Sequence, residues 1–265
     1  MKIFIITMDD PVYTLDFIKN IVIVRKQNIV GVAVPKGDRL KLAKGKSRLA
    51  YLISLFLIMG LPFFMTNVLK SMLHKIKKNI HSLGLIDDPT ILGFAEKNKI
   101  PTYRISSPNN KEFIKELISI KPDIIINQSQ NIIKKDLLKI PSIGVLNRHN
   151  ALLPKNRGRL TPFWVLFNKE KETGVSIHFV EEGLDSGDII VQKKFKVEKN
   201  DNFRSIVKKN YELASIAMIE ALNLLENNIS GFIENNDDEA TYNSTPTLND
   251  AWTYRKRKIL EFFCQ

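Results

Sequence analysis

Short apolar runs alternate with a helical pattern at the start of this chain. Residues 2–7 and 28–34 are rich in β-branched side chains, and each run is followed by a turn that contains proline. Runs of this length and composition are typical of strands that are buried on both faces of a parallel sheet. Residues 14–24, between them, have the length of a helix. The order strand, helix, strand predicts an α/β fold with a mostly parallel central sheet.

The same alternation continues to residue 146 and is followed by a hairpin-like pair of strands and one long helix. Residues 174–180 and 189–197 form the pair, and residues 202–225 carry apolar positions on one helical face. No glycine-rich G-x-G-x-x-G turn precedes the first helix, which excludes a dinucleotide-binding fingerprint. The other elements expected are helix 89–97, strand 100–105, helix 110–120, strand 123–127, a short helix ending at Leu137 and Leu138, and strand 143–146.

One apolar segment interrupts this pattern. Ala50 to Leu69 contains no charged residue and has the length of a membrane span, on the order of 20 residues. Basic runs flank it on both sides, so the charge asymmetry of a crossing is missing, and a crossing would separate parts of one sheet. Gly60 and Pro62 predict a break. We expect two short helices in an insertion at about residues 41–80, packed on the domain or in a homodimer, or lying in a membrane interface.

Composition limits the classes of protein that remain. The length of 265 residues suits one sizeable domain with at most a partial second. The single cysteine, Cys264, excludes an internal disulfide framework and a thiolate metal cluster. The N-terminus reads as a strand and lacks the pattern of a signal peptide. We therefore expect a cytoplasmic protein, with peripheral attachment to the inner face of a membrane as an alternative.

Positive charge is concentrated in the N-terminal third. The net charge is +12, and residues 1–78 contain 14 Lys and Arg but 4 Asp and Glu. Such asymmetry indicates an anionic partner, which could be a nucleotide, a nucleic acid or an acidic membrane surface. A solvated basic face that only aids solubility explains the same charge equally well.

Three polar side chains near turns suggest a site. Asn147 and His149 are one residue apart at the end of a strand, so alternation predicts that they share a face. Histidine carries protons near neutral pH, and an asparagine amide can stabilise an oxyanion. Asp185, in a Gly-Leu-Asp-Ser-Gly turn, would orient the His149 ring and favour its protonated form. These groups suit acyl transfer to an amine, although a capping asparagine and a structural histidine fit the same pattern.

The stretch from Val145 to Ile190 resembles the catalytic core of the folate-dependent formyltransferases. That family includes methionyl-tRNA, glycinamide ribonucleotide and amino-sugar N-formyltransferases, and shares N-x-H, S-L-L-P, R-G, T-G-V and L-D-x-G in that order. The resemblance covers about residues 1–200 and implies a Rossmann-like formyltransferase fold with a helical apolar insertion and a short C-terminal extension. The matching motifs are Asn147-Arg148-His149, Leu152-Leu153-Pro154, Arg157-Gly158, Thr173-Gly174-Val175 and Leu184-Asp185-Ser186-Gly187.

This resemblance implies roles for particular residues. Asn147, His149 and Asp185 are the expected catalytic residues, N10-formyltetrahydrofolate is the expected formyl donor, and no metal is expected. Asn147 and protonated His149 would stabilise the oxyanion, while Asp185 would hold His149 charged. Family members hold the pterin largely with backbone groups of two loops. The residues expected to bind the folate are Asn131, Ile132, Ile133, Leu152, Leu153, Pro154, Val180, Glu181, Glu182, Gly183 and Leu184.

Departures from the family pattern fall beside the catalytic positions. Ala151 stands in place of the serine of S-L-L-P, and Asn150 in place of a small residue. The proline that follows Arg-Gly comes one place late, at Pro162. These changes affect loop geometry and acceptor preference. His178 is expected to be a structural strand residue, with support of the catalytic site as the alternative.

Two features bear on the acceptor in opposite directions. About forty residues follow the helix ending near Leu225, fewer than the independent RNA-binding barrel of tRNA formyltransferases needs. The basic loop from Lys36 to Arg48, however, stands where those enzymes place an insertion that reaches the acceptor stem. The segment Ala240 to Pro246 resembles one found in both tRNA and sugar enzymes, and is expected to run back along the core near the acceptor site.

We therefore expect a catalytic domain at residues 1–200 and a C-terminal helix and tail at residues 201–265. The expected activity is formyl transfer to a primary amine of a small anionic acceptor, a nucleotide-linked amino sugar. One alternative is a methionyl-tRNA formyltransferase-like enzyme without the usual barrel. Another, from a different class, is a non-catalytic, membrane-associated binding module.

Overall fold

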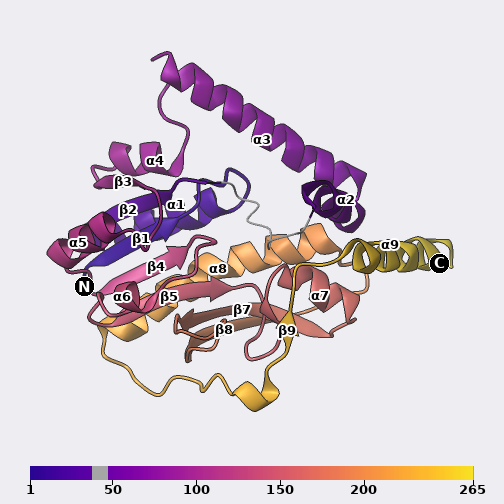
Figure 1. Cartoon of the computed structure of the whole chain (residues 1–265). Coiled ribbons are helices and arrows are strands. Elements are labelled where there is room, and N and C mark those ends of the chain that lie inside the picture. Colours follow the sequence, from indigo (N-terminus) through magenta and orange to yellow (C-terminus); the bar gives the residue numbers. More distant parts are fainter. Residues whose placement is uncertain (38–46, 265) are drawn as a thin grey trace.

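The central sheet contains seven of the strands in the described part of the chain (Figure 1). The computed structural model describes residues 1–37 and 47–264. The strand order is β3-β2-β1-β4-β5-β7-β8. The first five strands in this order run parallel to one another, whereas β7 is antiparallel to β5 and β8 is antiparallel to β7. The predicted, mostly parallel α/β sheet is confirmed. The strands are β1 (Ile3–Thr7), β2 (Ile29–Pro35), β3 (Thr102–Ile105), β4 (Ile124–Gln128), β5 (Gly144–His149), β7 (Glu172–Phe179) and β8 (Ile189–Lys196), with the separate pair β6 (Arg157–Gly158) and β9 (Tyr242–Asn243).

Helices cover both faces of this sheet and form three layers with it (Figure 1). Helices α1, α4 and α8 pack on one face, and α5 and α6 pack on the other. The helices are α1 (Thr14–Arg25), α2 (Arg48–Met59), α3 (Leu61–Ser82), α4 (Ile91–Lys97), α5 (Lys111–Ile120), α6 (Lys135–Leu138), α7 (Thr161–Phe167), α8 (Phe203–Glu226) and α9 (Leu248–Phe263), with 3-10 turns at Lys26–Asn28 and Asp237–Glu239.

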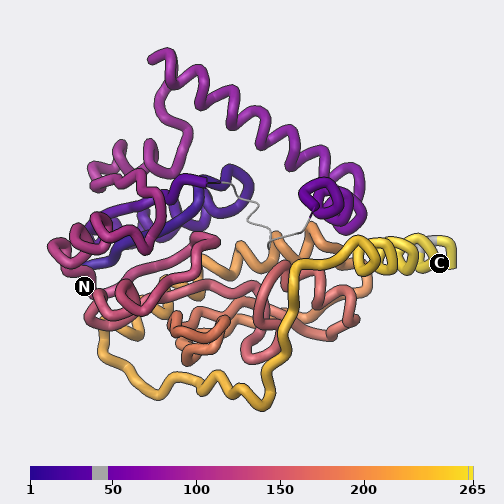
Figure 2. The backbone as a smooth tube through the Cα atoms, viewed as in Figure 1, coloured from indigo at the N-terminus to yellow at the C-terminus, as the bar shows by residue number. Residues whose placement is uncertain are grey.

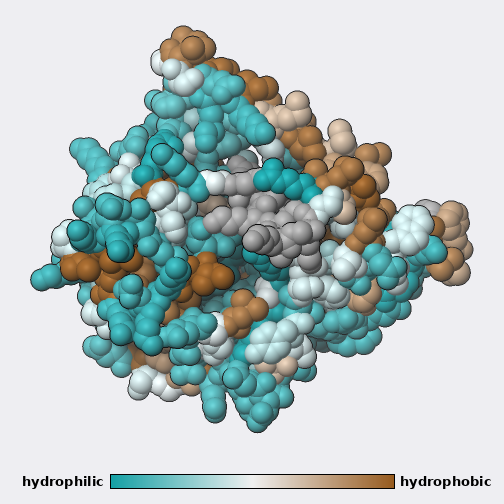
Figure 3. All heavy atoms as spheres, viewed as in Figure 1, coloured by the Kyte–Doolittle hydropathy of each residue, from teal (hydrophilic) through white to brown (hydrophobic). Residues whose placement is uncertain are grey.

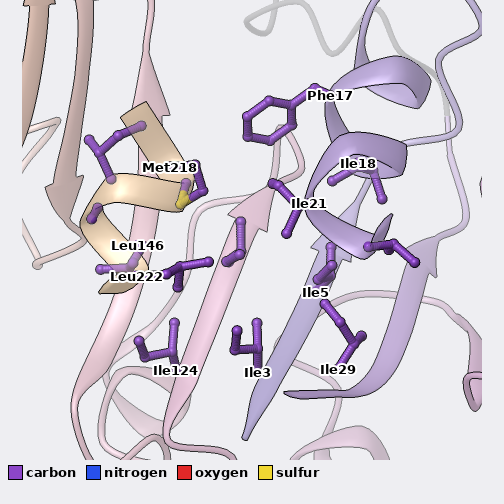
Figure 4. Close-up of a cluster of buried hydrophobic side chains, with 14 of the residues drawn as sticks. Ile3, Ile5, Phe17, Ile18, Ile21, Ile29, Ile124, Leu146, Met218 and Leu222 are labelled. Carbon is purple, nitrogen blue, oxygen red and sulfur yellow. The ribbon is translucent and has the colours of Figure 1, made fainter. Parts of the chain in front are cut away.

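Alternation along β1 shows how the apolar runs build two cores. Ile3 and Ile5 point into the core beneath α1 and α8, whereas Phe4 and Ile6 point into the core beneath α5 and α6. Figure 4 shows Ile3 and Ile5 between strands and helices, with Met218 of α8 nearby. Each such side chain contributes about 1.5–3 kcal/mol when fully buried. A run without polar interruptions is therefore required of a strand with helices on both sides.

The long helix α8 shares the first core with α1. Asn202 begins it with a capping box, in which the Asn202 side chain accepts from the backbone N–H of Ser205 and the Ser205 hydroxyl accepts from the backbone N–H of Asn202. The predicted helix at residues 202–225 is thus confirmed with its start displaced by one residue. The division of the chain at residue 200 stays a prediction.

The apolar insertion forms two helices, α2 and α3, and they break where the sequence predicts. Gly60 separates them with a φ of 74°, a conformation that glycine adopts without strain. The expectation of two short helices is wrong for α3, which has 22 residues and ends at Ser82. Lysine is a good helix former, so the basic positions after Leu69 extend the helix instead of ending it. Of the predicted insertion and of the basic loop Lys36 to Arg48, residues 38–46 lie outside the described residues.

Among the helices of the described residues, none combines the length and the apolarity that crossing a bilayer requires.

The C-terminal part returns across the core and ends in a helix that the hydrophobic pattern did not predict. Residues 227–247, which we call the strap, leave α8 and pass along the lower edge in Figure 2 before α9 begins. In the strap, β9 pairs in parallel with β6, and Ile233 forms a bridge with Ile189. The predicted return of residues 240–246 along the core is confirmed. In α9, Ala251 and Tyr254 are the buried apolar residues of the described part, and a run of four basic residues, 255–258, lies in the middle of the helix.

Candidate active site

The end of β5 carries Asn147 and His149, and strand alternation sets their direction. Val145 lies in the core under α5 and α6, whereas Leu146 lies in the core under α1 and α8. Asn147 and His149 follow the register of Val145, so their side chains share one face. Asn147 is also directly opposite His178 of β7, and opposite residues of an antiparallel pair point to the same side. The sheet therefore brings one amide and two imidazoles together.

The His149 ring is buried and held through one nitrogen. Its Nε2 lies 2.7 Å from the carbonyl oxygen of Asn156, and a carbonyl only accepts, so Nε2 carries a proton. The Asn156 backbone N–H donates to the Thr241 hydroxyl, and Asn243 donates to the Asn156 side chain, so the strap fixes this carbonyl. Nδ1 lies 3.5 Å from Oδ2 of Asp185. Nδ1 is consequently the nitrogen that can gain or lose a proton at the site.

Asp185 lies in a loop that is held at its backbone and at its carboxylate. The Gly158 N–H donates to Oδ2 of Asp185 at 3.0 Å. Asn235 of the strap donates through Nδ2 to the carbonyl oxygens of Asp185 and Gly187, at 2.8 and 2.9 Å. Gly158 has a φ of 112°, and a Cβ there would lie 2.1 Å from the carbonyl oxygen of Asn243. Only glycine lets β6 and β9 approach while its N–H faces Asp185.

Arg157, the other residue of the Arg-Gly motif, fastens the strap. Its buried guanidinium donates to the carboxylate of Asp237 at 2.6 Å, to the Tyr242 hydroxyl at 2.8 Å, and to both oxygens of Asn235 at 2.9 Å. Burial lowers the pKa of Arg157, but hydrogen bonds to Asp237 and Tyr242 outweigh burial and raise it above its usual value. Both residues of the motif therefore act on Asp185, Gly158 directly and Arg157 through Asn235.

Gln128 orients the Asn147 amide, a contact that the pattern of the sequence did not predict. Gln128 Nε2 donates to Oδ1 of Asn147 at 3.0 Å, so the Nδ2 group of Asn147 is directed away as a donor. Arg148 Nε in turn donates to Oε1 of Gln128 at 2.9 Å. The Arg148 guanidinium lies over the rings of Tyr211 and Phe17, at 4.2 and 5.2 Å from their centroids. The middle residue of N-x-H thus joins helices α1 and α8 to the candidate site.

His178 packs behind Asp185 as an uncharged histidine. Its Nδ1 lies 2.7 Å from the carbonyl oxygen of Phe179, and its Nε2 lies 3.8 Å from Oδ1 of Asp185. Burial lowers the pKa of His178 to about 4, because the Asp185 carboxylate only partly offsets the loss of solvent. At neutral pH the 3.8 Å approach is therefore not an ion pair. The expected structural histidine is placed beside the proposed catalytic carboxylate.

The two loops predicted to hold the pterin follow β4 and β7 and lie side by side. Lys135, which begins α6 directly after the first loop, forms an ion pair of 3.0 Å with Glu182 of the second loop. Ile132 is 85% exposed and Leu184 is 59% exposed, and an aromatic ring system could cover both side chains. Of the other residues predicted there, Asn131 and Val180 are half-buried, Ile133 is buried, and Glu181, Glu182 and Gly183 are exposed.

The third predicted segment, Leu152-Leu153-Pro154, is held by β7 and β8. Ser176 donates to the carbonyl oxygen of Ala151 and accepts from the Leu153 N–H, at 2.7 and 3.0 Å. Gln192 of β8 donates to the carbonyl oxygen of Leu153 at 2.7 Å. Leu153 is buried and precedes a cis peptide bond to Pro154, while Leu152 is half-buried.

A cavity of about 880 Å³ lies at the carboxyl ends of β1, β2 and β4, and its described lining does not include Asn147, His149 or Asp185. Ser129, Gln130 and Asn131, which follow Gln128, line it, so it begins next to the residue that orients Asn147. In α/β sheets ligands bind at this edge of the strands. Helix α3 forms another part of the wall. The basic residues in the lining are Lys36, Lys75, Lys78 and Arg104.

Asp9, in the loop after β1, fastens α3 to this wall. Its carboxylate accepts from Lys78 Nζ at 3.0 Å and lies 3.1 Å from Nε2 of His74. Burial raises the pKa of Asp9, but the hydrogen bonds to His74 and Lys78 outweigh burial and lower it. The basic face of α3 is thereby held toward the cavity.

Comparison with known proteins gives a family match that covers more than half of the chain. Residues 69–222 match the family described as Formyl transferase. A methionyl-tRNA formyltransferase from Clostridioides difficile (strain 630) is 30% identical over 190 residues, which are 66% of this chain and 61% of that protein. The bifunctional polymyxin resistance protein ArnA from Wigglesworthia glossinidia brevipalpis is 37% identical over 147 residues, which are 55% of this chain and 22% of that protein. The chain thus spans less than two thirds of both relatives.

Solved structures share the fold at lower identity. An N-formyltransferase from Helicobacter canadensis, crystallised with folinic acid and dTDP-3-aminofucose, superimposes with a TM-score of 0.56 at 17% identity. The superposition covers 92% of this chain and 71% of that one. At this identity the comparison establishes the Rossmann-like formyltransferase architecture.

Proposed function

Because this chain belongs to the formyl transferase family, we propose that it transfers a formyl group from N10-formyltetrahydrofolate to a primary amine. The observation that carries the proposal is the approach of His149 Nδ1 to Oδ2 of Asp185, 3.5 Å apart, beside the Asn147 amide. The ring is fixed at Nε2, so Nδ1 has a defined direction. Three side chains that suit formyl transfer to an amine therefore converge without a protein nucleophile.

The loops after β4 and β7 fit a folate. Ile132 and Leu184 expose large apolar side chains on two adjacent loops, and such surfaces usually bind an apolar or aromatic partner. We assign Asn131 to Ile133, Leu152 to Pro154 and Val180 to Leu184 to the folate site. When bound there, the folate supplies the activated formyl group.

The residues of this chain have distinct tasks in the transfer. The acceptor nitrogen forms a bond to the formyl carbon, the bond from that carbon to the donor nitrogen breaks, and one amine proton passes to the donor nitrogen. Asn147 Nδ2 and a proton on His149 Nδ1 stabilise negative charge that develops on the formyl oxygen. Asp185 balances the positive charge of the protonated His149 ring. Together, Asp185 and His149 carry the amine proton to the donor nitrogen.

A formyl-transfer assay with His149→Asn tests the chemistry. Removing the titratable ring is expected to lower kcat by about 10²- to 10⁴-fold, the usual contribution of general acid–base catalysis. His81→Gln, a change in α3 where the ring contacts the Ile86 carbonyl, is the matched control and should retain activity. Full activity of His149→Asn would reject the catalytic assignment.

For the acceptor, we propose a nucleotide-linked amino sugar. The cavity of about 880 Å³ has the size of a small-molecule site. Its lining includes Lys36 and Arg104, which suit phosphate groups. The Helicobacter canadensis neighbour, whose structure contains dTDP-3-aminofucose, provides a precedent within the fold.

A transfer RNA is the second candidate acceptor, because relatives of about 30% identity are methionyl-tRNA formyltransferases. A panel of amino-sugar nucleotides, glycinamide ribonucleotide and charged initiator tRNA, each with N10-formyltetrahydrofolate, separates the candidates. Turnover of an amino-sugar nucleotide supports our proposal. Turnover of tRNA alone would overturn the acceptor while leaving formyl transfer intact.

A further inference from the structure

The insertion helices present an apolar face to solvent, directly opposite the side that packs on the protein. On α3 the buried residues are Phe63 and His74, which project from one side of the helix. The exposed apolar residues recur every three or four positions on the other side. Figure 3 shows brown, hydrophobic atoms along the outer edge of α3 and down to α2. The exposed apolar residues of the two helices are Leu49, Leu52, Ile53, Phe56, Leu61, Met65, Leu69, Met72, Leu73 and Ile76.

Positive charge borders this apolar face. Between Ser47 and Ile86 the sequence contains no Asp or Glu. Lys70 and Lys77 project along one margin of the α3 stripe, and Lys75 along the other, as the helical period of 100° per residue requires. All three lysines are exposed. A long apolar stripe with lysines on both margins is the pattern of a helix that lies in the interface of an anionic membrane.

A second copy of the chain fits this apolar face less well than an anionic membrane does, because of the lysines at its margins. A symmetric dimer would place this face against itself, bringing Lys70, Lys75 and Lys77 near their equivalents without an intervening acid from the insertion. Such an arrangement brings like charges together and removes them from water. An anionic leaflet supplies both the apolar medium and the opposite charge.

We propose that the exposed face of α2 and α3 is a docking surface for an anionic lipid leaflet. The docking surface comprises the ten exposed apolar residues named above and the margin lysines Lys70, Lys75 and Lys77. The surface is presented rigidly, since His74 and Lys78 contact Asp9 and Phe63 packs against Phe203 of α8. The proposal does not depend on the activity proposed above. It requires peripheral binding, in which the helices lie in the plane of the leaflet.

Vesicle co-sedimentation tests the docking surface with the full chain. Wild type is expected to bind vesicles of phosphatidylcholine mixed with phosphatidylglycerol more strongly than vesicles of phosphatidylcholine alone. Leu69→Glu with Ile76→Glu should weaken binding by about tenfold or more, because two inserted side chains are lost. Lys70→Gln with Lys77→Gln should weaken binding to the mixed vesicles by about fivefold per lysine and reduce its salt sensitivity.

The matched control replaces exposed isoleucines on other helices. Ile118 of α5 and Ile216 of α8 are 54% and 56% exposed, so Ile118→Glu with Ile216→Glu makes the same chemical change elsewhere and should bind like wild type. All replaced side chains are exposed, and thermal unfolding checks that each variant folds. The proposal is overturned if wild type does not bind the mixed vesicles, or if the Leu69 and Ile76 variant binds them equally well. It is also overturned if light scattering shows a wild-type dimer that this variant abolishes.

Discussion

At the scale of single residues, the Asn147 amide depends on its neighbour. Gln128 donates to Oδ1 of Asn147 and accepts from Arg148. An asparagine amide can rotate to exchange its donor and acceptor, and only the donor stabilises an oxyanion. The orientation of Asn147 is therefore set by a residue of the adjacent strand.

Gln128→Glu tests this orientation. Glutamate keeps an acceptor for Arg148 but cannot donate to Asn147, so the Asn147 amide is expected to turn its donor toward residue 128. We expect kcat to fall by about tenfold to a hundredfold with little change in KM, a part of the loss seen when an oxyanion donor is removed. Gln128→Leu, which lacks both contacts, should be at least as impaired. Wild-type kcat in Gln128→Glu would contradict the assigned role.

His178 makes stability depend on pH. Burial lowers the pKa of His178 to about 4 in the folded chain, whereas an unfolded histidine titrates near its ordinary value of 6.5. Between these values the unfolded state binds more protons, so the free energy of unfolding decreases as pH falls from about 6.5 toward 4. The expected loss from this group is up to about 1 kcal/mol for each pH unit.

Urea unfolding of wild type and His178→Gln at several pH values between 7 and 5 measures this contribution. The glutamine variant should show a flatter decline over that window, because its side chain does not titrate. Other groups, such as Asp9 with its lowered pKa, contribute to both curves alike. Parallel curves would show that His178 is not the buried neutral group described above.

At the scale of elements, the strap connects a distant part of the chain to the loop that carries Asp185. Asn235 accepts from Arg157 and donates to the carbonyl oxygens of Asp185 and Gly187. Asn235→Ala is expected to lower the free energy of unfolding by about 1–3 kcal/mol, because buried hydrogen-bonding groups lose their partners. It should also lower kcat, since the backbone of Asp185 is less constrained.

The adjacent Asn236→Ala is the matched control. Asn236 accepts from the Asp238 N–H at the start of the 3-10 turn and belongs to the same strap. Its effect on kcat should be small. Hydrogen exchange of residues 181–187 distinguishes the two variants, with faster exchange expected in Asn235→Ala alone. Equal exchange would show that the strap does not hold the loop.

At the scale of the whole molecule, positive charge from separate segments gathers around one cavity. Lys36 follows β2 and Arg104 belongs to β3, and both line it. Lys36→Gln is expected to raise KM for a phosphorylated acceptor several-fold with kcat nearly unchanged, because it removes binding common to ground and transition states. KM for the folate should stay constant. The acceptor KM of wild type should also rise with ionic strength, since salt screens these charges. An unchanged acceptor KM would place the phosphate elsewhere.

The pattern of the sequence predicted most of the sheet, because a strand covered on both faces must be apolar throughout and a turn must follow it. The order of strands along the chain, the long helix α8 and the break at Gly60 were predicted for the same local reasons. Helix α9 was missed because the tail that precedes it is polar and four basic residues, 255–258, interrupt its apolar positions. The length of α3 was also missed, since two short helices were expected on either side of the break at Gly60 and Pro62, whereas α3 continues through the basic positions after Leu69 to Ser82.

The sequence by itself determined the fold class and the positions of Asn147, His149 and Asp185, because these depend on local alternation and on motifs of fixed order. Only the tertiary structure decided which groups orient them. Gln128 reaches Asn147 across two paired strands, and Asn235 reaches Asp185 from a segment fifty residues away in sequence. Such contacts leave no periodic signal, because a hydrogen bond between distant segments requires only that two side chains meet after the chain has folded.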